Sequence, residues 1–179
     1  GEPAAQVCEE IVQTSGLSNT IVRASWFNQN FSEGMFHSFI EAGSIQLPVG
    51  AVGEPFVDVD DICEVVIASL TDPRHDGQLY EVTGPELLTF AELAETFSDV
   101  LAHPVSFVEV SLPDFVAALQ SQKVDSHAID MLTYLFTEVL DGRNAYVVDG
   151  VERALGRPAK TFEQFVVTNR ERFNGGNHA

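Results

Sequence analysis

The sequence is poor in basic residues. It contains nine lysines and arginines against 27 aspartates and glutamates, and its only lysines are Lys123 and Lys160. The resulting formal net charge of −18 repels phosphate backbones and anionic lipid surfaces at long range. We therefore expect neither nucleic acid nor a membrane as a direct partner of this chain.

Cysteine and long apolar runs are also scarce. Cys8 and Cys63 are the only cysteines, and two isolated thiols do not make a disulfide framework. We interpret both as reduced thiols that are buried or idle. No stretch approaches the roughly 18 apolar residues of a membrane span, and no charged segment followed by an apolar run opens the chain. We expect a cytoplasmic location.

Two motifs of dinucleotide enzymes are missing. No G-x-G-x-x-G or G-x-x-G-x-x-G occurs, and this is the turn that lets a pyrophosphate approach a helix N-terminus. The nearest pattern, residues 50–53, precedes an expected strand and is interpreted as an ordinary loop. None of the three tyrosines is followed four residues later by lysine. A self-contained Tyr/Lys proton relay is excluded, and the catalytic residue stays unknown.

Signals for metal sites and hydrolases are equally weak. The five histidines are scattered, with no H-E-x-x-H and no paired Cys/His spacing, so we expect no zinc site. Ser25 does not lie in a G-x-S-x-G elbow, which argues against a hydrolase. The acidic cluster of Asp58, Asp60 and Asp61 could bind a cation. We favour a helix start there instead, because carboxylates stabilise helix N-termini, and we expect no metal.

What the sequence does contain is an alternation of helical and strand patterns. With 179 residues and 45% hydrophobic residues, the chain can bury the core of a single domain. Apolar periodicity predicts strands near residues 20–22, 45–50, 79–84 and 105–110. It predicts helices over residues 3–14, 31–42 and 125–140, and others that start near residues 61, 89, 111, 149 and 161.

Three of these helix starts have the spacing of a capping box, in which residues three apart satisfy each other's backbone N–H groups. The pairs are Asp61 with Glu64, Thr89 with Glu92, and Thr161 with Gln164. If Asp61 is a cap, its replacement by alanine costs about 1 kcal/mol. The closing residues 174–179 are polar and expected to fray.

The loop from Ala24 to Phe31 is the candidate binding site. It leaves the carboxyl end of a buried strand, where open α/β sheets place their ligands. Its aromatic side chains can wall an apolar slot, and its amide side chains can orient carbonyl groups. These residues are Trp26, Phe27 and Phe31, and Asn28, Gln29 and Asn30. The alternative is that Phe27 and Phe31 are core residues and that Asn30 caps the next helix.

Four blocks of sequence, in order, resemble the NmrA-like atypical short-chain dehydrogenases/reductases. They are residues 15–31 (SGLSNTIVRASWFNQNF), 56–62 (FVDVDDI), 80–94 (YEVTGP, then TFAELA) and 150–165 (GVERALGRPAKTFEQF). Each block alone is only moderately specific, but the four together cover essentially the whole chain. One departure is Ala24, which stands where most relatives have proline and loosens the loop.

The resemblance implies an α/β fold. It would be an incomplete Rossmann-type fold, with a short, mostly parallel sheet and a helical C-terminal substrate-binding part. Residues 1–179 would form a single unit from which the N-terminal dinucleotide-binding half is absent. The strand near residues 20–23 would then present an unpaired edge, so we expect a homo-oligomer, or an edge covered by a rearranged segment, the missing half or a second chain.

The resemblance also implies a function. The parent would be an NAD(P)H-dependent oxidoreductase acting on a small, quinone-like substrate. Cofactor contacts would fall on Ala24, Ser25, Trp26 and Phe27, and substrate contacts on Trp26, Phe27, Asn30 and Phe31. NAD(P)H would bind the complete protein but not this chain alone with high affinity. The alternatives are a non-catalytic, dinucleotide-sensing regulator of the NmrA type and a nucleoside-diphosphate-sugar epimerase relative.

Overall fold

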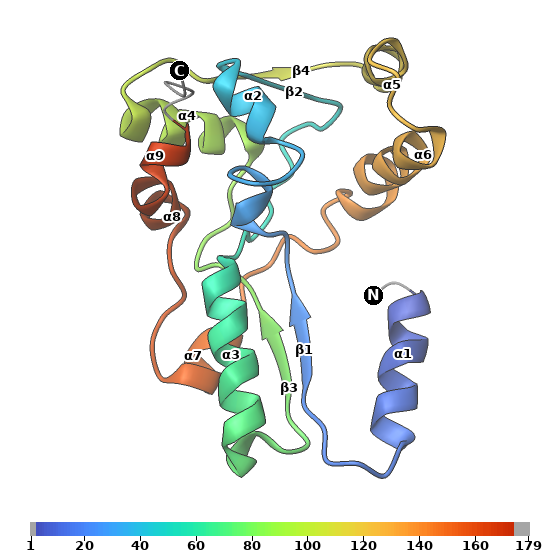
Figure 1. Ribbon diagram of the computed structural model, residues 1–179, viewed down its shortest axis with the longest axis vertical. Helices are drawn as coiled ribbons and strands as arrows, with labels where there is room; N and C mark the ends of the chain where they lie inside the picture. Colours follow the sequence, from blue (N-terminus) through green and yellow to red (C-terminus); the bar gives the residue numbers. More distant parts are fainter. Residues whose placement is uncertain (1–2, 174–179) are drawn as a thin grey trace.

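The computed structural model describes residues 3–173 and shows two lobes along its long axis (Figure 1). In chain order the elements are α1 (Pro3–Thr14), β1 (Ile21–Ala24), η1 (Asn28–Asn30), α2 (His37–Glu41), β2 (Ser44–Leu47), α3 (Val59–Thr71), η2 (Pro73–His75), β3 (Leu79–Val82), α4 (Phe90–Leu101), β4 (Ser106–Glu109), α5 (Leu112–Ser121), α6 (Ser126–Tyr134), η3 (Leu135–Val139), α7 (Gly150–Leu155), α8 (Phe162–Thr168) and α9 (Arg170–Phe173).

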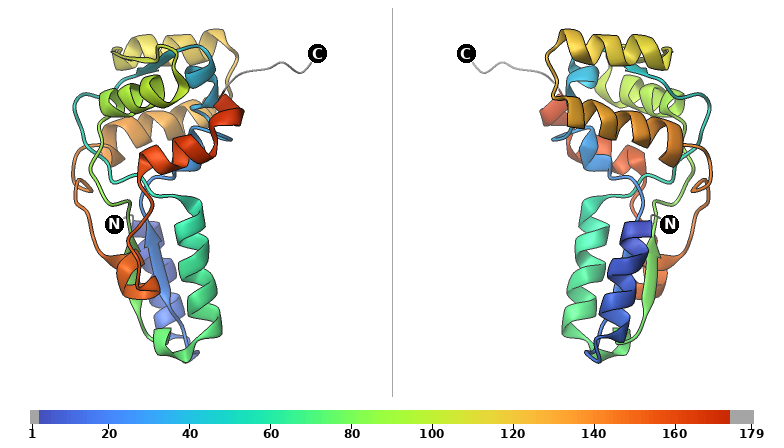
Figure 2. Two further views of the ribbon diagram at one scale, coloured as in Figure 1. Left: turned by 90° about the vertical axis from the view of Figure 1, so that its left-hand side faces the viewer. Right: turned by 90° about the vertical axis from the view of Figure 1, so that its right-hand side faces the viewer.

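The lower lobe is built on the parallel pair β1 and β3. Ile21 pairs with Leu79 at one end of the register and Ala24 with Val82 at the other. Helices α3 and α7 pack against this pair, while α1 stands on the side of β1 that faces away from β3 (Figures 1 and 2). A small core joins the sheet to its helices; it consists of Val57, Val65, Tyr80, Val82 and Val151.

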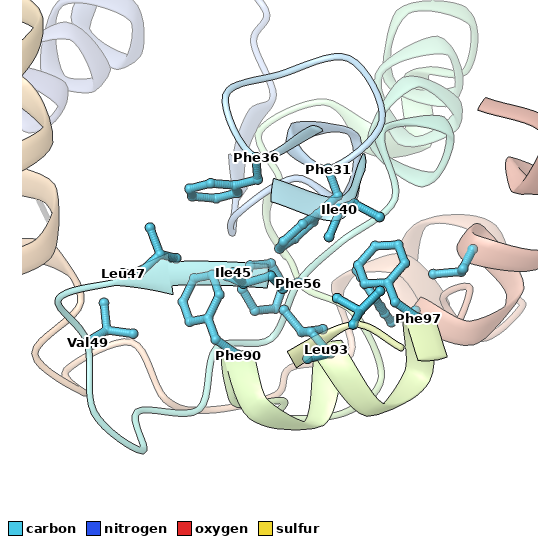
Figure 3. Close-up of a cluster of buried hydrophobic side chains, with 14 of the residues drawn as sticks. Phe31, Phe36, Ile40, Ile45, Leu47, Val49, Phe56, Phe90, Leu93 and Phe97 are labelled. Carbon is cyan, nitrogen blue, oxygen red and sulfur yellow. The ribbon is translucent and has the colours of Figure 1, made fainter. Parts of the chain in front are cut away.

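The upper lobe is built on the parallel pair β2 and β4, covered by α4, and it contains the larger core. Figure 3 shows that aromatic rings fill its centre. Phe31 is fully buried there, and its ring centroid lies 5.1–6.3 Å from those of five other phenylalanines. Edge-on and tilted contacts at these separations stabilise such a core beyond simple burial.

The two lobes are joined by a region that we call the waist. In it, residues 26–28, 54–57 and 84–88 are linked by backbone hydrogen bonds. Phe27 and Val57 form an isolated parallel bridge, and Glu54 and Leu88 form an antiparallel one. Gly84 N donates a 3.1 Å hydrogen bond to Pro55 O. A Cβ on Gly84 would lie 1.9 Å from the Phe56 carbonyl oxygen, so only glycine allows this approach. The waist therefore fixes the segment that follows β1.

The four strands expected from the sequence are present, and the two sheets are parallel, which confirms the α/β fold class. The capping boxes at Thr89 and Thr161 are confirmed by their reciprocal hydrogen bonds. No helix within residues 3–173 is both long and apolar enough to cross a membrane. The prediction for residues 174–179 lies outside the described residues.

Other expectations were wrong. The helix expected over residues 31–42 is limited to α2, because residues 28–36 form a 3₁₀ turn and bends that bring Phe31 and Phe36 into the core. The last helix is split into α8 and α9, whereas the helix expected over residues 125–140 is present and continues from α6 as a π-helix over residues 135–139. Of the two interpretations of the cysteines, buried or idle, burial is wrong, because both are free and exposed.

Candidate functional site

The loop after β1 is held by backbone hydrogen bonds across the waist. Val57 N donates to Trp26 O at 2.8 Å, and Asn28 N donates to Val57 O at 2.8 Å. The loop thus leaves the carboxyl end of β1 along a second extended segment. This position follows from the parallel sheet, as the sequence predicted.

The loop's aromatic residues divide between surface and core. Phe27 is 42% exposed, and the Trp26 ring is half-buried and stacks on Phe36 with centroids 6.2 Å apart and planes 9° apart. Phe31, which was expected to line a substrate slot, is 0% exposed and belongs to the core. Trp26 and Phe27 can offer flat apolar faces to a ligand; Phe31 cannot.

The loop's amide residues also differ from expectation. Both ends of the Gln29 side chain contact α3: Nε2 donates to Asp58 Oδ1 at 3.0 Å, and Oε1 accepts from Val59 N at 2.9 Å. Gln29 therefore holds the loop against α3 rather than orienting a ligand carbonyl. Asn30 is half-buried and does not cap α2, whose cap residue is Phe36.

Asn28 is the buried member of this group. Its side-chain amide is completely buried, and neither its nitrogen nor its oxygen has a hydrogen-bond partner among the described residues. Most buried polar groups are paired with protein or ordered water. Ala24 is exposed and Ser25 half-buried at the end of β1, next to Trp26. Ligand contact by any of these loop residues stays a prediction.

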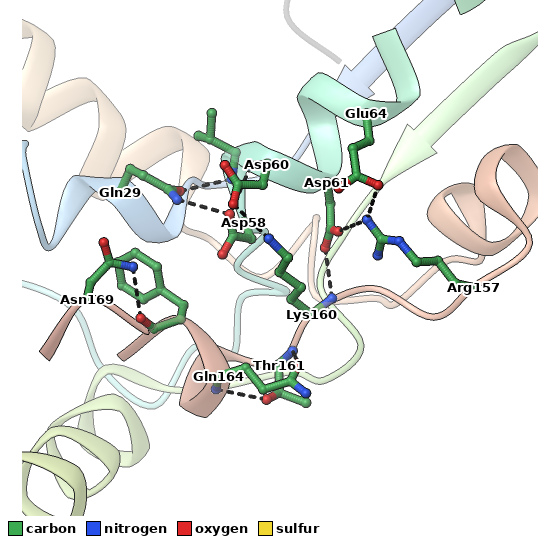
Figure 4. Close-up of polar contacts among 12 residues, drawn as sticks. Gln29, Asp58, Asp60, Asp61, Glu64, Arg157, Lys160, Thr161, Gln164 and Asn169 are labelled. Atoms are coloured by element: carbon green, nitrogen blue, oxygen red, sulfur yellow. Dashed lines mark hydrogen bonds and ion pairs between the residues drawn. The ribbon is translucent and has the colours of Figure 1, made fainter. Parts of the chain in front are cut away.

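The N-terminus of α3 is the most highly charged part of the site's surroundings (Figure 4). Asp58 is the N-cap, and its carboxylate accepts from Asp60 N at 2.9 Å. Asp61, expected to be the cap, is instead completely buried in the first turn. Its Oδ2 accepts from Lys160 N at 2.8 Å, and its Oδ1 lies 2.8 Å from Arg157 Nη2. The assignment of Asp61 as the cap was wrong.

Basic side chains from the C-terminal segment complete this cluster. Arg157 Nη2 also lies 2.6 Å from Glu64, and this hydrogen bond is the main reason that the pKa of Arg157 is raised. Lys160 Nζ lies 2.7 Å from Asp60. The acidic residues that could have bound a cation are thus paired with side chains and backbone N–H groups. No group of three or more His, Cys, Asp or Glu that could hold a metal ion lies within residues 3–173.

One buried acid, Glu54, was not predicted from the sequence. Glu54 is 0% exposed, and neither of its carboxylate oxygens has a hydrogen-bond partner in the described part of the chain. Burial raises the pKa of its carboxyl to about 7, and repulsion from Asp141 adds to the shift. The local sequence, a glutamate between Gly53 and Pro55, gives no sign of burial.

Two surface depressions lie away from the loop. One of about 550 Å³ lies between the end of β3 and α7, and it contains none of the predicted loop residues. It is lined by Gly84, Pro85, Val147, Val148, Asp149, Val151, Glu152, Pro158 and Ala159. The other, of about 240 Å³, lies beside β1 and α3.

Comparison with known proteins shows what the chain is similar to. A model of the NmrA-like family matches residues 5–166. The chain is 31% identical to Prestalk A differentiation protein A of Dictyostelium discoideum and 32% identical to an NAD(P)H azoreductase of Xenophilus azovorans. These matches cover 88% and 92% of this chain, but only 52% and 57% of the two relatives. The chain therefore spans little more than half the length of either.

Solved structures show the same fold. An NADPH-dependent quinone oxidoreductase from Escherichia coli superposes with a TM-score of 0.79 at 21% identity, over 91% of this chain and 59% of that one. The negative transcriptional regulator NmrA, solved with NADP, superposes with a TM-score of 0.59 at 18% identity, over 94% and 58%. At these identities the likeness concerns the Rossmann-like fold, which agrees with the fold class expected from the sequence.

Proposed function

The chain belongs to the NmrA-like family, and from this premise we propose that it is the substrate-side portion of an NAD(P)H-dependent oxidoreductase that reduces a quinone-like molecule. The observation that carries the proposal is the pair Trp26 and Phe27 at the carboxyl end of β1. A flat, partly exposed aromatic surface in this position suits a planar, electron-poor substrate. The azoreductase and quinone oxidoreductase among the similar proteins support this choice.

NAD(P)H, when bound, supplies the hydride, and the protein binds and orients the reactants. The residues of the loop fit the ring end of such a cofactor, because the exposed Phe27 and the half-buried Trp26 offer apolar contact close to the exposed residue Ala24. They do not supply the Gly-rich turn that binds pyrophosphate. We therefore assign Ala24, Ser25, Trp26 and Phe27 to the cofactor and Trp26, Phe27 and Asn30 to the substrate. A cytoplasmic location is part of the same proposal.

Fluorescence of Trp26, the only tryptophan, tests the proposal directly. We expect a soluble quinone to quench it saturably, and Phe27→Ala to weaken this binding up to about tenfold, because an aromatic contact is worth up to about 1.5 kcal/mol. Tyr146→Ala is the matched control, since Tyr146 is 47% exposed outside the loop. Absence of saturable quenching, or equal effects of the two variants, contradicts the assignment. NADPH alone should show no low-micromolar binding to this chain.

The regulator remains the second candidate. It is favoured by one observation, namely that no tyrosine and lysine stand at the spacing of a proton relay. Steady-state oxidation of NADPH by quinones in a protein that contains both halves distinguishes the two. Binding without turnover supports the regulator, and turnover supports the reductase. No feature of the described residues specifically supports an epimerase-like activity.

We further propose that another polypeptide segment pairs with the free edge of β1. Within residues 3–173, β1 pairs only with β3. Apolar side chains lie beside β1: Val66 and Leu70 on α3 line one depression together with Val22 and are 38% and 81% exposed. An unpaired strand edge flanked by apolar side chains readily recruits another strand. A second copy of the chain or a preceding dinucleotide-binding segment would satisfy it.

Light scattering tests this interface on the 179-residue chain. We expect a dimer or larger oligomer, and we expect Leu70→Glu to shift it toward monomer because the charge would be buried at the contact. Val167→Glu is the control, because Val167 is 55% exposed on α8 in the upper lobe. A stable monomer in which the amide of Val22 exchanges slowly contradicts the proposal; Ile21 is not informative, because Ile21 N already donates to Gln78 O.

A further inference from the structure

Glu54 lies at the waist with a carboxyl group that contacts no hydrogen-bonding partner within residues 3–173. Its side chain is 0% exposed. Its backbone, in contrast, is fully engaged: Glu54 N donates to Leu88 O at 3.0 Å, and Leu88 N donates to Glu54 O at 3.0 Å. This two-bond bridge holds the carboxyl in place. An ionised carboxylate without a partner is costly in such a position, whereas a protonated one is tolerated.

The charge that acts on Glu54 from a neighbouring segment is that of Asp141, in the connection between η3 and α7. Asp141 is itself paired with Arg143, whose Nη2 lies 2.6 Å from Asp141 Oδ2. Arg143 therefore neutralises much of the charge of Asp141, and within residues 3–173 it makes no hydrogen bond or ion pair with Glu54. Burial and this repulsion act in the same direction, and both favour the protonated form.

The segment that begins at Glu54 also holds the candidate site. Three residues later, Val57 N donates to Trp26 O, and Val57 O accepts from Asn28 N, both at 2.8 Å. Two side chains of the loop also attach it to this region: Gln29 bonds to Asp58 and Val59, and the Phe31 ring centroid lies 5.7 Å from that of Phe56. If the bridge between Glu54 and Leu88 opens, the segment that orders Trp26 loses one attachment, while the hydrogen bond from Gly84 N to Pro55 O and the buried Phe56 side chain still hold it.

We propose that Glu54 is a pH-dependent switch on the candidate site, which we call the catch. When Glu54 is protonated, the bridge to Leu88 stays closed and the Trp26 loop is ordered. When Glu54 is ionised, the bridge opens and the loop is loosened. The identification of this loop as a ligand site rests on the proposed function. The catch itself does not, because it is defined by opening of the bridge.

The direction of the pH dependence follows from proton linkage. The carboxyl has a pKa of about 7 when buried and an ordinary value of 4.5 when the bridge is open. The closed state therefore binds more protons between these values, and it loses stability as pH rises through that window. A difference of about 2.5 pKa units allows the opening equilibrium to increase up to about 300-fold, and this change levels off about one pH unit above the pKa of the closed state.

Amide hydrogen exchange at Glu54 and Leu88 measures the opening. After correction for the intrinsic pH dependence of exchange, we expect protection to fall between pH 5 and pH 7.5, together with increased acrylamide quenching of Trp26. Glu54→Gln should remove this pH dependence, and Glu86→Gln, a nearby exposed glutamate, should retain it. Asp141→Asn should move the midpoint to lower pH, because it removes the repulsion.

The outcomes separate the catch from the proposed function. Protection that does not change with pH in the unaltered protein overturns the catch, as does the same change in Glu54→Gln. The measurement on the unaltered protein decides the question even if a variant fails to fold. A catch that operates in a protein that binds no quinone leaves the inference intact and refutes the reductase proposal instead.

Discussion

Replacing Asp61 by alanine is expected to lower the free energy of unfolding by about 3 kcal/mol, roughly three times the value of a helix cap. Asp61 is 0% exposed and accepts from Lys160 N while it pairs with Arg157. Its removal leaves a buried N–H and a partly buried guanidinium without this partner. The loss stays near the lower limit for buried pairs because Arg157 is about one-third exposed and keeps Glu64.

Urea denaturation at pH 7 measures this effect. Asp60→Ala is the matched control, because Asp60 is 69% exposed in its pair with Lys160, and such surface pairs contribute at most about 1 kcal/mol. Adding Arg157→Ala to Asp61→Ala should cost less than the sum of the single changes, since the pair is already broken. A loss of only about 1 kcal/mol for Asp61→Ala would contradict this prediction, because it is the loss expected for a simple helix cap.

The second large effect is expected for Gly84→Ala, which should destabilise the protein by about 3 kcal/mol. The added Cβ would lie 1.9 Å from Phe56 O, and backbone cannot yield as a flexible side chain can. The segment at Phe56 must therefore move, and Val57, which holds Trp26, moves with it. We expect the Trp26 emission spectrum to change together with stability.

Gly50→Ala provides the control for this prediction. A Cβ on Gly50 would meet nothing closer than Glu109 Oε1 at 3.9 Å, which is ordinary contact. Its effect should lie within about 0.5 kcal/mol, as for most substitutions without a steric conflict. If both glycine variants denature at the same urea concentration, the waist is not closely packed at Gly84.

Several features of this protein were determined by the sequence alone because their causes are local. Short apolar segments, one of them with period-two alternation, were enough to predict the four strands, and the capping boxes at Thr89 and Thr161 use residues only three apart. The resemblance of four blocks to the NmrA-like family was confirmed by the family match over residues 5–166. The position of the loop that follows β1 was also predictable, because open α/β sheets place such loops at the carboxyl ends of their parallel strands.

Only the tertiary structure decided the roles of the polar residues around the site. Asp61 has capping-box spacing with Glu64, but its partners, Arg157 and Lys160, lie nearly a hundred residues away. The sequence suggests that Gln29 orients a ligand, but in the structure its side chain bonds to Asp58 and Val59 at the start of α3. Glu54 becomes a buried acid because the segments around Leu88 and Asp141 close over it. Burial and long-range pairing depend on which distant segments meet, and no local pattern encodes that.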